Sequence, residues 1–286
     1  MKKIIYFIEF LVVEFLFIIF KVIGYKSASN LGFFIGKNFG NFFRKKKSII
    51  ENLHKSKIVI NTSDNQFVNN VLGNYGRILA EYPFLKDFRK NKLEQFIRID
   101  GIENLDKIKS NKKPVVFISG HFNNFELMAM QIEKHGINLA AIYRPLNNIF
   151  LNKTMERIRT KYICRNQIRK GRSGTRQILE NLKKGNSIAL MIDQRVTEGI
   201  LCKFFDREAF TTSIPAQTVK KYHLRVVPVH IERLKNYYFK IKISDPISFS
   251  DHHSIHDITY ALNNQLEIMI KKNPNQWIWS HNRWKR

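Results

Sequence analysis

Residues 114–126 read PVVFISGHFNNFE, and this stretch indicates the fold of the chain. An apolar run, Pro114–Ile118, ends abruptly in a Ser-Gly-His sequence at residues 119–121, and a carboxylate follows at Glu126. Short, continuous apolar runs of this kind are typical of strands in a sheet that is covered on both faces. The stretch therefore predicts a buried strand that brings a histidine to the edge of a sheet.

Four more strand-like runs follow, at Leu139–Tyr143, Ser187–Ile192, Val226–Ile231 and Tyr238–Ile243. Helical patterns alternate with them, at Glu126–His135, Asn152–Tyr162, Arg176–Lys184, Ala216–Tyr222 and His256–Lys272. Residues 62–88 also carry apolar side chains at helical spacing. Strands and helices in alternation predict an α/β fold with a mostly parallel central sheet flanked by helices.

Polar residues stand directly after three of these strands. They are Ser119-Gly120-His121, Tyr143-Arg144-Pro145 and Asp193-Gln194-Arg195. In open α/β sheets, ligands bind beyond the carboxyl ends of the strands. A base, a cation and a carboxylate–amide pair would meet at that edge, and this convergence predicts an active site.

The residues alone leave two interpretations of His121 and Glu126 open. Asn123 with Glu126 three positions later fits a helix-starting capping pattern, in which His121 is only a polar loop residue. Alternatively, His121 is a general base, because histidine accepts protons near neutral pH, and Glu126 orients its ring. The second interpretation requires His121 in the turn before a helix and Glu126 in its first turn. No serine or cysteine stands in a nucleophile-elbow motif, which favours direct, base-assisted transfer over a covalent intermediate.

The N-terminal segment predicts a membrane anchor. Residues 4–23 read IIYFIEFLVVEFLFIIFKVI and are apolar except for Glu9, Glu14 and Lys21. As a helix the segment is about 30 Å long, which matches the hydrocarbon core of a bilayer, and no cleavage-site pattern follows it. The two glutamates lie about 140° apart on a helical wheel, so a spanning and an interfacial helix both stay open. An ordinary buried helix is the third alternative.

The charge of the chain predicts an anionic partner. Its 286 residues include 49 Lys and Arg against 23 Asp and Glu, a net charge of +26. Such an excess attracts nucleic acid, an anionic membrane or an acidic protein or substrate. Nucleic acid is not expected, because no zinc-finger spacing, aromatic RNP pattern or recognisable helix-turn-helix is present. A dense basic run either binds such a partner or forms a solvated helix face: Arg157, Arg159, Lys161, Arg165, Arg169, Lys170, Arg172 and Arg176.

Three tryptophans stand among basic residues near the end of the chain, at Trp277, Trp279 and Trp284. Indole is favoured at membrane interfaces, which predicts an interfacial position for them. Packing in the core is the alternative. The two cysteines, Cys164 and Cys202, have no spacing that suggests a disulfide framework or a zinc site, and no metal or cofactor is expected.

The ordered set of motifs resembles the bacterial lipid A biosynthesis acyltransferase family, the late lauroyl/myristoyl acyltransferases. The similarity covers nearly the whole chain, and Gly120-His121 with Glu126 matches the family's H-x4-D/E signature. The other matching segments are Asn74-Tyr75-Gly76-Arg77, Tyr143-Arg144-Pro145-Leu146-Asn147-Asn148, Asp193-Gln194, Lys203-Phe204-Phe205, Thr211-Thr212 and Trp279-Ser280-His281-Asn282-Arg283-Trp284-Lys285. The chain departs from the pattern at Cys202, which replaces the glycine that usually precedes the Phe-Phe segment.

The resemblance implies a glycerolipid-acyltransferase-like fold and an acyl transfer. His121 would be the general base and Glu126 its orienting partner. The base would deprotonate a hydroxyl of a lipid A precursor, which attacks the thioester of an acyl-carrier protein. Substrate contacts would come from Arg144, Asp193, Gln194 and Asn124.

The resemblance also implies a location and a division of the chain. Residues 1–25 would be a membrane-anchor helix and residues 26–286 an acyltransferase domain. The enzyme would lie at the bacterial inner membrane, with this domain on the cytoplasmic side and with acyl-carrier protein, lipid A precursor and anionic lipid as partners. An acyltransferase that acts on another acceptor, such as a glycerolipid or glycolipid, is the main alternative. A membrane-tethered nucleic-acid-binding protein and an inactive membrane scaffold are less favoured.

Overall fold

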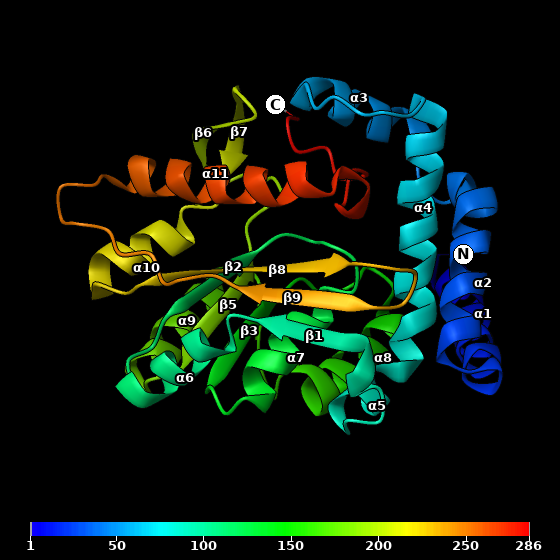
Figure 1. The fold of residues 1–286 in the computed structure, drawn as a ribbon, viewed down its shortest axis with the longest axis horizontal. Helices are drawn as coiled ribbons and strands as arrows, with labels where there is room; N and C mark the ends of the chain where they lie inside the picture. The colour runs from blue at the N-terminus through cyan, green and yellow to red at the C-terminus, as the bar shows by residue number, and fades with distance from the viewer. Residues whose placement is uncertain (1, 286) are drawn as a thin grey trace.

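The computed structural model describes residues 2–285 and has an α/β fold built on a seven-stranded sheet (Figure 1). The strand order is β1-β9-β8-β2-β5-β3-β4, and every neighbouring pair is parallel except β8 with β9. The strands are β1 (Ile97–Asp100), β2 (Val116–Ser119), β3 (Leu139–Tyr143), β4 (Asn166–Arg169), β5 (Ser187–Met191), β8 (Val226–Arg233) and β9 (Phe239–Ile243). A separate antiparallel pair consists of β6 (Ile200–Phe204) and β7 (Arg207–Thr211). The predicted mostly parallel sheet is confirmed.

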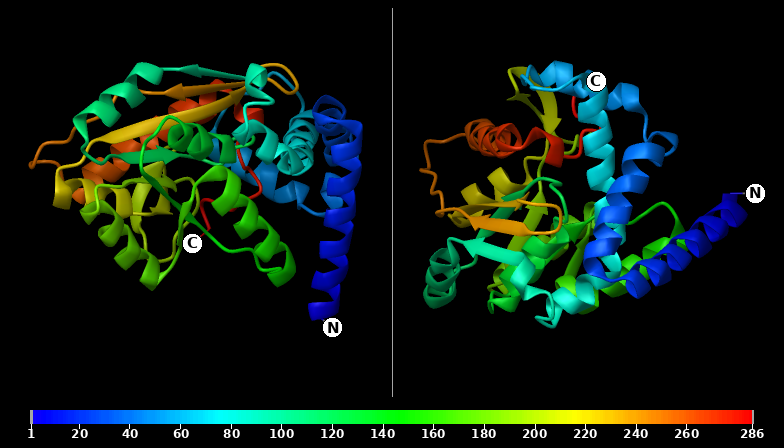
Figure 2. Two further views of the ribbon diagram at one scale, coloured as in Figure 1. Left: turned by 90° about the horizontal axis from the view of Figure 1, so that it is seen from below. Right: turned by 45° about the vertical axis from the view of Figure 1, so that its right-hand side comes forward.

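Helices cover both faces of this sheet, as Figures 1 and 2 show. One face carries α6 (Ile102–Asn111), α7 (Glu126–Lys134) and α8 (Ile149–Ile158). The other face carries α9 (Arg172–Lys183), which contacts Asn166 and Ile168 of β4, together with α10 (Ile214–Tyr222) and α11 (Ile255–Lys272). Because all four residues of the central strand β2 are buried, the continuous apolar run in the sequence is explained by cover on both sides.

The remaining helices lie before the sheet in the chain, and α1, α2 and α4 stand at one end of it (Figure 1). They are α1 (Lys2–Ile23), α2 (Tyr25–Phe39), α3 (Lys46–Ser56), α4 (Asp64–Glu81) and α5 (Leu85–Arg89). Short helical turns occur at Gly40–Phe42, Tyr82–Phe84, Glu94–Phe96, Arg159–Ile163 and Pro274–Gln276. Within residues 2–285, no helix combines the length and the apolar character needed to cross a bilayer. The predicted spanning anchor is therefore unsupported, and the division at residue 25 stays a prediction.

α1 has two different faces. Its carboxylates face the protein: Glu9 accepts a hydrogen bond from Nδ2 of Asn148 (2.9 Å), and Glu14 accepts one from Oγ1 of Thr154 (3.1 Å). Asn148 is the N-cap of α8, and Thr154 lies within that helix. Large apolar side chains are exposed along the helix at intervals of three or four residues: Ile4, Ile8, Leu11, Phe15, Ile18 and Val22. We call these six residues the α1 stripe.

α2 and α4 pack with their backbones in contact. A Cβ atom at Gly76 of α4 would lie 1.9 Å from the carbonyl oxygen of Gly32 in α2. A Cβ atom at Gly36 would lie 2.2 Å from the carbonyl oxygen of Leu72. Both distances are far below van der Waals contact, so the helix pair approaches this closely only because these positions lack a side chain.

Gly76→Ala is expected to lower the free energy of unfolding by about 1–3 kcal/mol, since the added methyl group overpacks the α2–α4 contact. A loss of stability would be informative, because alanine is a better helix former than glycine and stabilises a helix that has no close neighbour. Urea unfolding followed by circular dichroism measures the change. Asn65→Ala, at an exposed position of α4, is the matched control and should stay within about 0.5 kcal/mol of the wild type. A Gly76→Ala protein as stable as this control would contradict the packing argument.

Candidate active site

His121 and Asp193 form the centre of the candidate site, and parallel strand pairing brings them together. Ser119 of β2 pairs with Met191 of β5, so the residues two positions further along each strand lie at the same level. Nδ1 of His121 is 2.7 Å from Oδ1 of Asp193, and the backbone N–H of His121 donates to Oδ2 at 2.8 Å. The ends of these two strands therefore converge as the sequence predicts.

Asp193 is fully buried and accepts three hydrogen bonds. Besides the two from His121, Nε1–H of Trp277 donates to Oδ2 at 2.9 Å. Burial alone would raise the pKa of Asp193, but the attraction of His121 and the three hydrogen bonds outweigh burial and hold this pKa below its ordinary value. An ionised carboxylate accepts a hydrogen bond from Nδ1 when this nitrogen carries the proton. The neutral imidazole then has its free lone pair on Nε2. This is the tautomer that a general base with an orienting carboxylate requires.

A glycine lets the histidine loop pass close to the carboxylate. A Cβ atom at Gly120 would lie 2.8 Å from Cδ1 of Leu266, 2.9 Å from the ring of Phe122 and 3.3 Å from Oδ2 of Asp193. A larger residue at this position would have to displace the side chains of Leu266 and Phe122 and would press on the carboxylate of Asp193. The Ser-Gly-His sequence that ends β2 therefore has a steric reason.

Glu126 does not orient the ring of His121, and this prediction was wrong. Its Oε1 accepts hydrogen bonds from the hydroxyl of Tyr82 and from Nε of Arg159 (2.8 Å), and it forms an ion pair with Nη2 of Arg159 (2.7 Å). Nδ1 of His121 is already taken by Asp193. Burial lowers the pKa of Arg159, but the charge of Glu126 outweighs it and the pKa rises above its ordinary value. Glu126 therefore neutralises a buried arginine beside the site.

Asn123 does not cap α7, so the capping interpretation was also wrong. The backbone of Asn123 is left-handed (φ 42°), and α7 begins only at Glu126, after Phe125, with no side-chain cap. Nδ2 of Asn123 donates instead to the carbonyl of Ile231 (3.2 Å) and to Oε1 of Gln276 (2.7 Å). The side chain thus ties the loop after β2 to β8 and to the C-terminal segment.

The other three predicted site residues lie in different surroundings. Asn124 is fully buried, and its Nδ2 donates to Oε2 of Glu81 (3.3 Å), so the structure gives it a structural contact in place of the predicted substrate contact. Arg144 is exposed near Lys170, whose pKa is lowered by partial desolvation of its ammonium group and by the charge of Arg144. Gln194 follows Asp193 and is partly exposed. The substrate roles of Arg144 and Gln194 stay predictions.

Glu81 is the centre of a second polar cluster, which the sequence analysis missed. Nη1 and Nη2 of Arg233 donate to its two oxygens at 2.6 and 3.0 Å, and Oγ of Ser29 donates to Oε1 at 2.7 Å. Arg77 donates in turn to Oγ of Ser29 (2.9 Å). This cluster joins α2, α4 and β8 to the loop that carries His121, through Asn124. Its partners are 152 positions apart, and no local pattern reveals such a pairing.

The C-terminal segment belongs to the core. Trp277, Trp279 and Trp284 are only 1%, 0% and 8% exposed, so their predicted interfacial position was wrong and core packing is correct. The segment also contacts the site: besides the bond from Trp277 to Asp193, the backbone N–H of Arg195 donates to Nε2 of His281 (3.0 Å). Trp277 is therefore a site residue that sequence reasoning missed, although the Trp-rich tail was noticed.

The predicted basic run is divided between the surface and the interior. Arg159 is bound to Glu126, whereas six of the others are exposed: Arg157, Lys161, Arg165, Arg169, Lys170 and Arg176. The side chain of Arg172 lies outside the described part of the chain. The exposed members leave the choice between a binding surface and a solvated face open.

Comparison with known proteins shows the family to which the chain belongs. The family model described as bacterial lipid A biosynthesis acyltransferase matches residues 1–286. The chain is 21% identical over 197 residues to lipid A biosynthesis acyltransferase 2 of Shigella flexneri, a match that covers 66% of this chain and 60% of that protein. It is 21% identical over 191 residues to lipid A biosynthesis myristoyltransferase of Escherichia coli (strain K12), covering 66% of this chain and 58% of that protein. The chain thus spans about three fifths of the length of these curated relatives. On the match of the family model, the chain belongs to the bacterial lipid A biosynthesis acyltransferase family.

Proposed function

We propose that this protein transfers a fatty acyl chain from acyl-carrier protein to a hydroxyl group of a lipid A precursor. The observation that carries the proposal is the His121–Asp193 pair at the carboxyl ends of β2 and β5, in a chain of this family. The names of both curated relatives refer to lipid A biosynthesis, and one is a myristoyltransferase.

In the proposed reaction, Nε2 of His121 accepts the proton of the acceptor hydroxyl. The hydroxyl oxygen attacks the thioester carbonyl, the carbon–sulfur bond breaks and an ester forms. The imidazolium returns its proton to the leaving thiolate of the carrier. Asp193 stabilises the imidazolium through Nδ1 without taking the proton, as the carboxylate of a hydrolase triad does.

Charge supports the proposed partners. The net charge of +26 and the exposed arginines and lysines between α8 and α9 favour an acidic carrier protein and a phosphorylated lipid. Arginine is especially suited to phosphate, since its planar guanidinium forms paired hydrogen bonds. Arg144, which follows β3 and lies near Lys170, is our candidate for contact with the lipid.

The α1 stripe supports binding to a membrane surface, and we propose that this surface is the cytoplasmic face of the bacterial inner membrane. The stripe exposes apolar side chains along a helix whose two glutamates accept hydrogen bonds from Asn148 and Thr154, so it can enter a lipid interface while both carboxylates keep a protein donor. The basic cluster at residues 44–47 adds attraction to anionic lipid, on the order of 1 kcal/mol per charge near the surface. We therefore propose interfacial binding through α1.

Deletion of the gene is expected to remove one acyl chain from lipid A, and mass spectrometry of extracted lipid A measures the mass of that chain. Re-expression of the wild type should restore the chain, whereas re-expression of His121→Ala should not. Purified protein with acyl-carrier-protein thioester and the precursor should reproduce the transfer in vitro. Unchanged lipid A together with a changed glycerolipid would identify another acceptor, and no change in either lipid would overturn the proposal.

A further inference from the structure

The two oxygens of Asp193 have different partners, and Trp277 makes the difference. Oδ2 accepts from the indole N–H of Trp277 (2.9 Å) and from the backbone N–H of His121 (2.8 Å). Oδ1 is 2.7 Å from Nδ1 of His121. The backbone and indole donors thus hold one oxygen, and this leaves the other oxygen directed at the imidazole.

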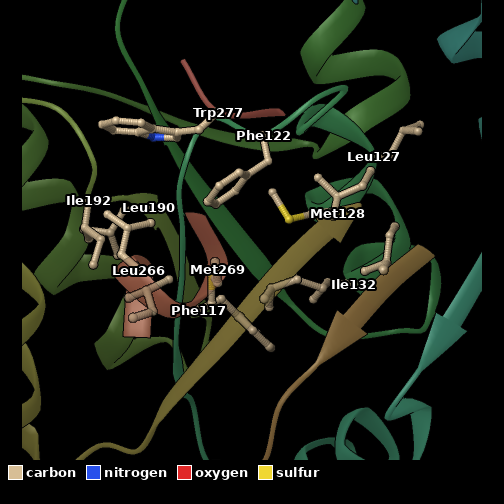
Figure 3. Packing of buried hydrophobic residues seen from close by; sticks show 14 of the residues in the cluster. Phe117, Phe122, Leu127, Met128, Ile132, Leu190, Ile192, Leu266, Met269 and Trp277 are labelled. Carbon is tan, nitrogen blue, oxygen red and sulfur yellow. The ribbon is translucent and has the colours of Figure 1, made fainter. Parts of the chain in front are cut away.

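The chain around Trp277 is fixed to the loop that carries His121. Trp277 forms an isolated antiparallel bridge with Phe122, the residue after His121. The backbone N–H of Asn123 donates to the carbonyl of Gln276 (3.1 Å), and its side chain donates to Oε1 of the same residue (2.7 Å). Figure 3 shows Phe122 and Trp277 in the same cluster of buried side chains. The position of the indole relative to His121 is therefore set by backbone pairing.

Aromatic packing fixes the orientation of the indole. Trp277 is 1% exposed and meets Trp279 edge to face, with ring centroids 4.7 Å apart and planes at 78°. It also meets Phe204 at 6.0 Å and 63°. A ring held on two sides has no room to turn, so its N–H is a donor of fixed direction. Such a donor restricts rotation of the Asp193 carboxylate.

We propose that Trp277 is a positioning residue of the acyl transfer, whose indole N–H holds Asp193 so that Nε2 of His121 points at the acceptor hydroxyl. The inference rests on the proposed function, because it assigns His121 as the base. Trp277 acts through Asp193 and does not touch the reacting atoms.

Three other charged or titratable side chains face Asp193: His121, His281 and Arg283. Burial lowers the pKa of His281, which keeps this ring neutral near pH 7. Burial also lowers the pKa of Arg283, to about 10, so it stays a cation and donates to Oγ1 of Thr211. Loss of the indole N–H would concentrate the charge of Asp193 on the side of His121. Protonated His121 would then be held more tightly, and the acid limb of the pH–rate profile would move to higher pH.

The test compares Trp277→Phe with Trp284→Phe in the full-length protein, assayed with acyl-carrier-protein thioester and lipid A precursor. Both variants remove a buried indole N–H from the C-terminal segment, but Trp284 donates to the carbonyl of Phe204 and packs against Phe204 and Phe205. Trp277→Phe is expected to lower kcat about tenfold with KM nearly unchanged and to move the acid limb upward. Trp284→Phe should leave the acid limb where it is in the wild type.

A second variant covers the case in which Trp277→Phe does not fold. Benzothienylalanine at position 277 keeps the shape of indole and replaces the N–H by sulfur, so it removes only the donor. An acid limb that is unchanged in the folded Trp277 variants, or that moves equally in Trp284→Phe, would overturn the proposal.

A measurement without substrate separates this inference from the proposed function. The ring nitrogens of His121, observed by 15N NMR, should shift in the Trp277 variants and not in Trp284→Phe. If the wild type transfers no acyl chain, the proposed function fails, and the NMR comparison still tests the Trp277 contact. Unshifted ring nitrogens in the Trp277 variants would overturn that contact.

Discussion

Asp193→Asn is expected to lower the rate of acyl transfer about 10²–10⁴-fold, the range for loss of general-base catalysis, while the protein stays folded. The amide keeps the shape of the side chain and one oxygen for the N–H groups of His121 and Trp277. Its NH₂ group, however, donates to Nδ1 of His121 and reverses the tautomer. The proton then sits on Nε2, where the lone pair is needed. Steady-state kinetics with acyl-carrier-protein thioester measure the loss, and circular dichroism checks the fold.

Glu126→Gln is the informative comparison, because Glu126 was the carboxylate expected from the sequence. It contacts Tyr82 and Arg159, so its neutral amide leaves the guanidinium of Arg159 without its counter-charge. We expect a lower melting temperature for Glu126→Gln with acyl transfer largely retained, whereas Asp193→Asn should lose acyl transfer in a protein that is still folded at the assay temperature. The assignment of Asp193 as the partner of His121 would be falsified if Asp193→Asn kept the wild-type rate.

Glu81→Leu is expected to lower the free energy of unfolding by about 3–5 kcal/mol, the range for breaking a buried ion pair. The side chains of Glu81 and Arg233 are 0% and 5% exposed, so the mutation leaves the guanidinium of Arg233 buried without its carboxylate. Arg77, whose pKa burial and the charge of Arg233 already lower to about 10, loses the same counter-charge. Urea unfolding followed by circular dichroism measures the change.

The double variant Glu81→Leu/Arg233→Met separates two causes of lost stability. One is the missing attraction between Glu81 and Arg233, and the other is the buried charge of Arg233 left without a partner. Replacing both members of a buried pair by apolar residues costs much less than removing one, so the double variant should recover most of the lost stability. Glu180→Ala is the surface control, since Glu180 pairs with Arg176 at 49% and 85% exposure and such pairs contribute less than about 1 kcal/mol. A double variant no more stable than Glu81→Leu would rule out this account.

The sequence predicts the central part of the fold well, because its strands are uniformly apolar. β3 occupies the predicted residues Leu139–Tyr143, and β2 and β5 differ from the prediction only at their ends. β1 and β4 were missed, since Ile97-Arg98-Ile99-Asp100 and Asn166-Gln167-Ile168-Arg169 are short and largely polar. Their hydrogen bonds are made to a neighbouring strand, and the pattern of a single segment does not reveal that pairing.

The candidate site was only partly predictable, for a related reason. The residues after β2 and β5 were singled out because parallel strands end at one edge of a sheet, and His121 and Asp193 do meet there. The motif spacing nevertheless suggested Glu126, which is close in sequence but directed at Arg159. Local spacing does not tell which way a side chain points at the start of a helix. Trp277 was out of reach because its contact comes from a distant part of the chain.

The position of β2 in the sheet has a consequence for the kinetics of folding. Val116 pairs with Ile188 on one edge and with Val226 on the other, so the strand that carries His121 gains both neighbours only after two long loops have closed. Loop closure of this kind raises the contact order and slows folding. A chain that has not yet docked β8 exposes an unpaired apolar edge of β2, where it is prone to pair with another molecule. Protection of this edge of β2 therefore depends on β8, a strand far from β2 along the chain, whereas the pairing of His121 with Asp193 depends on β5.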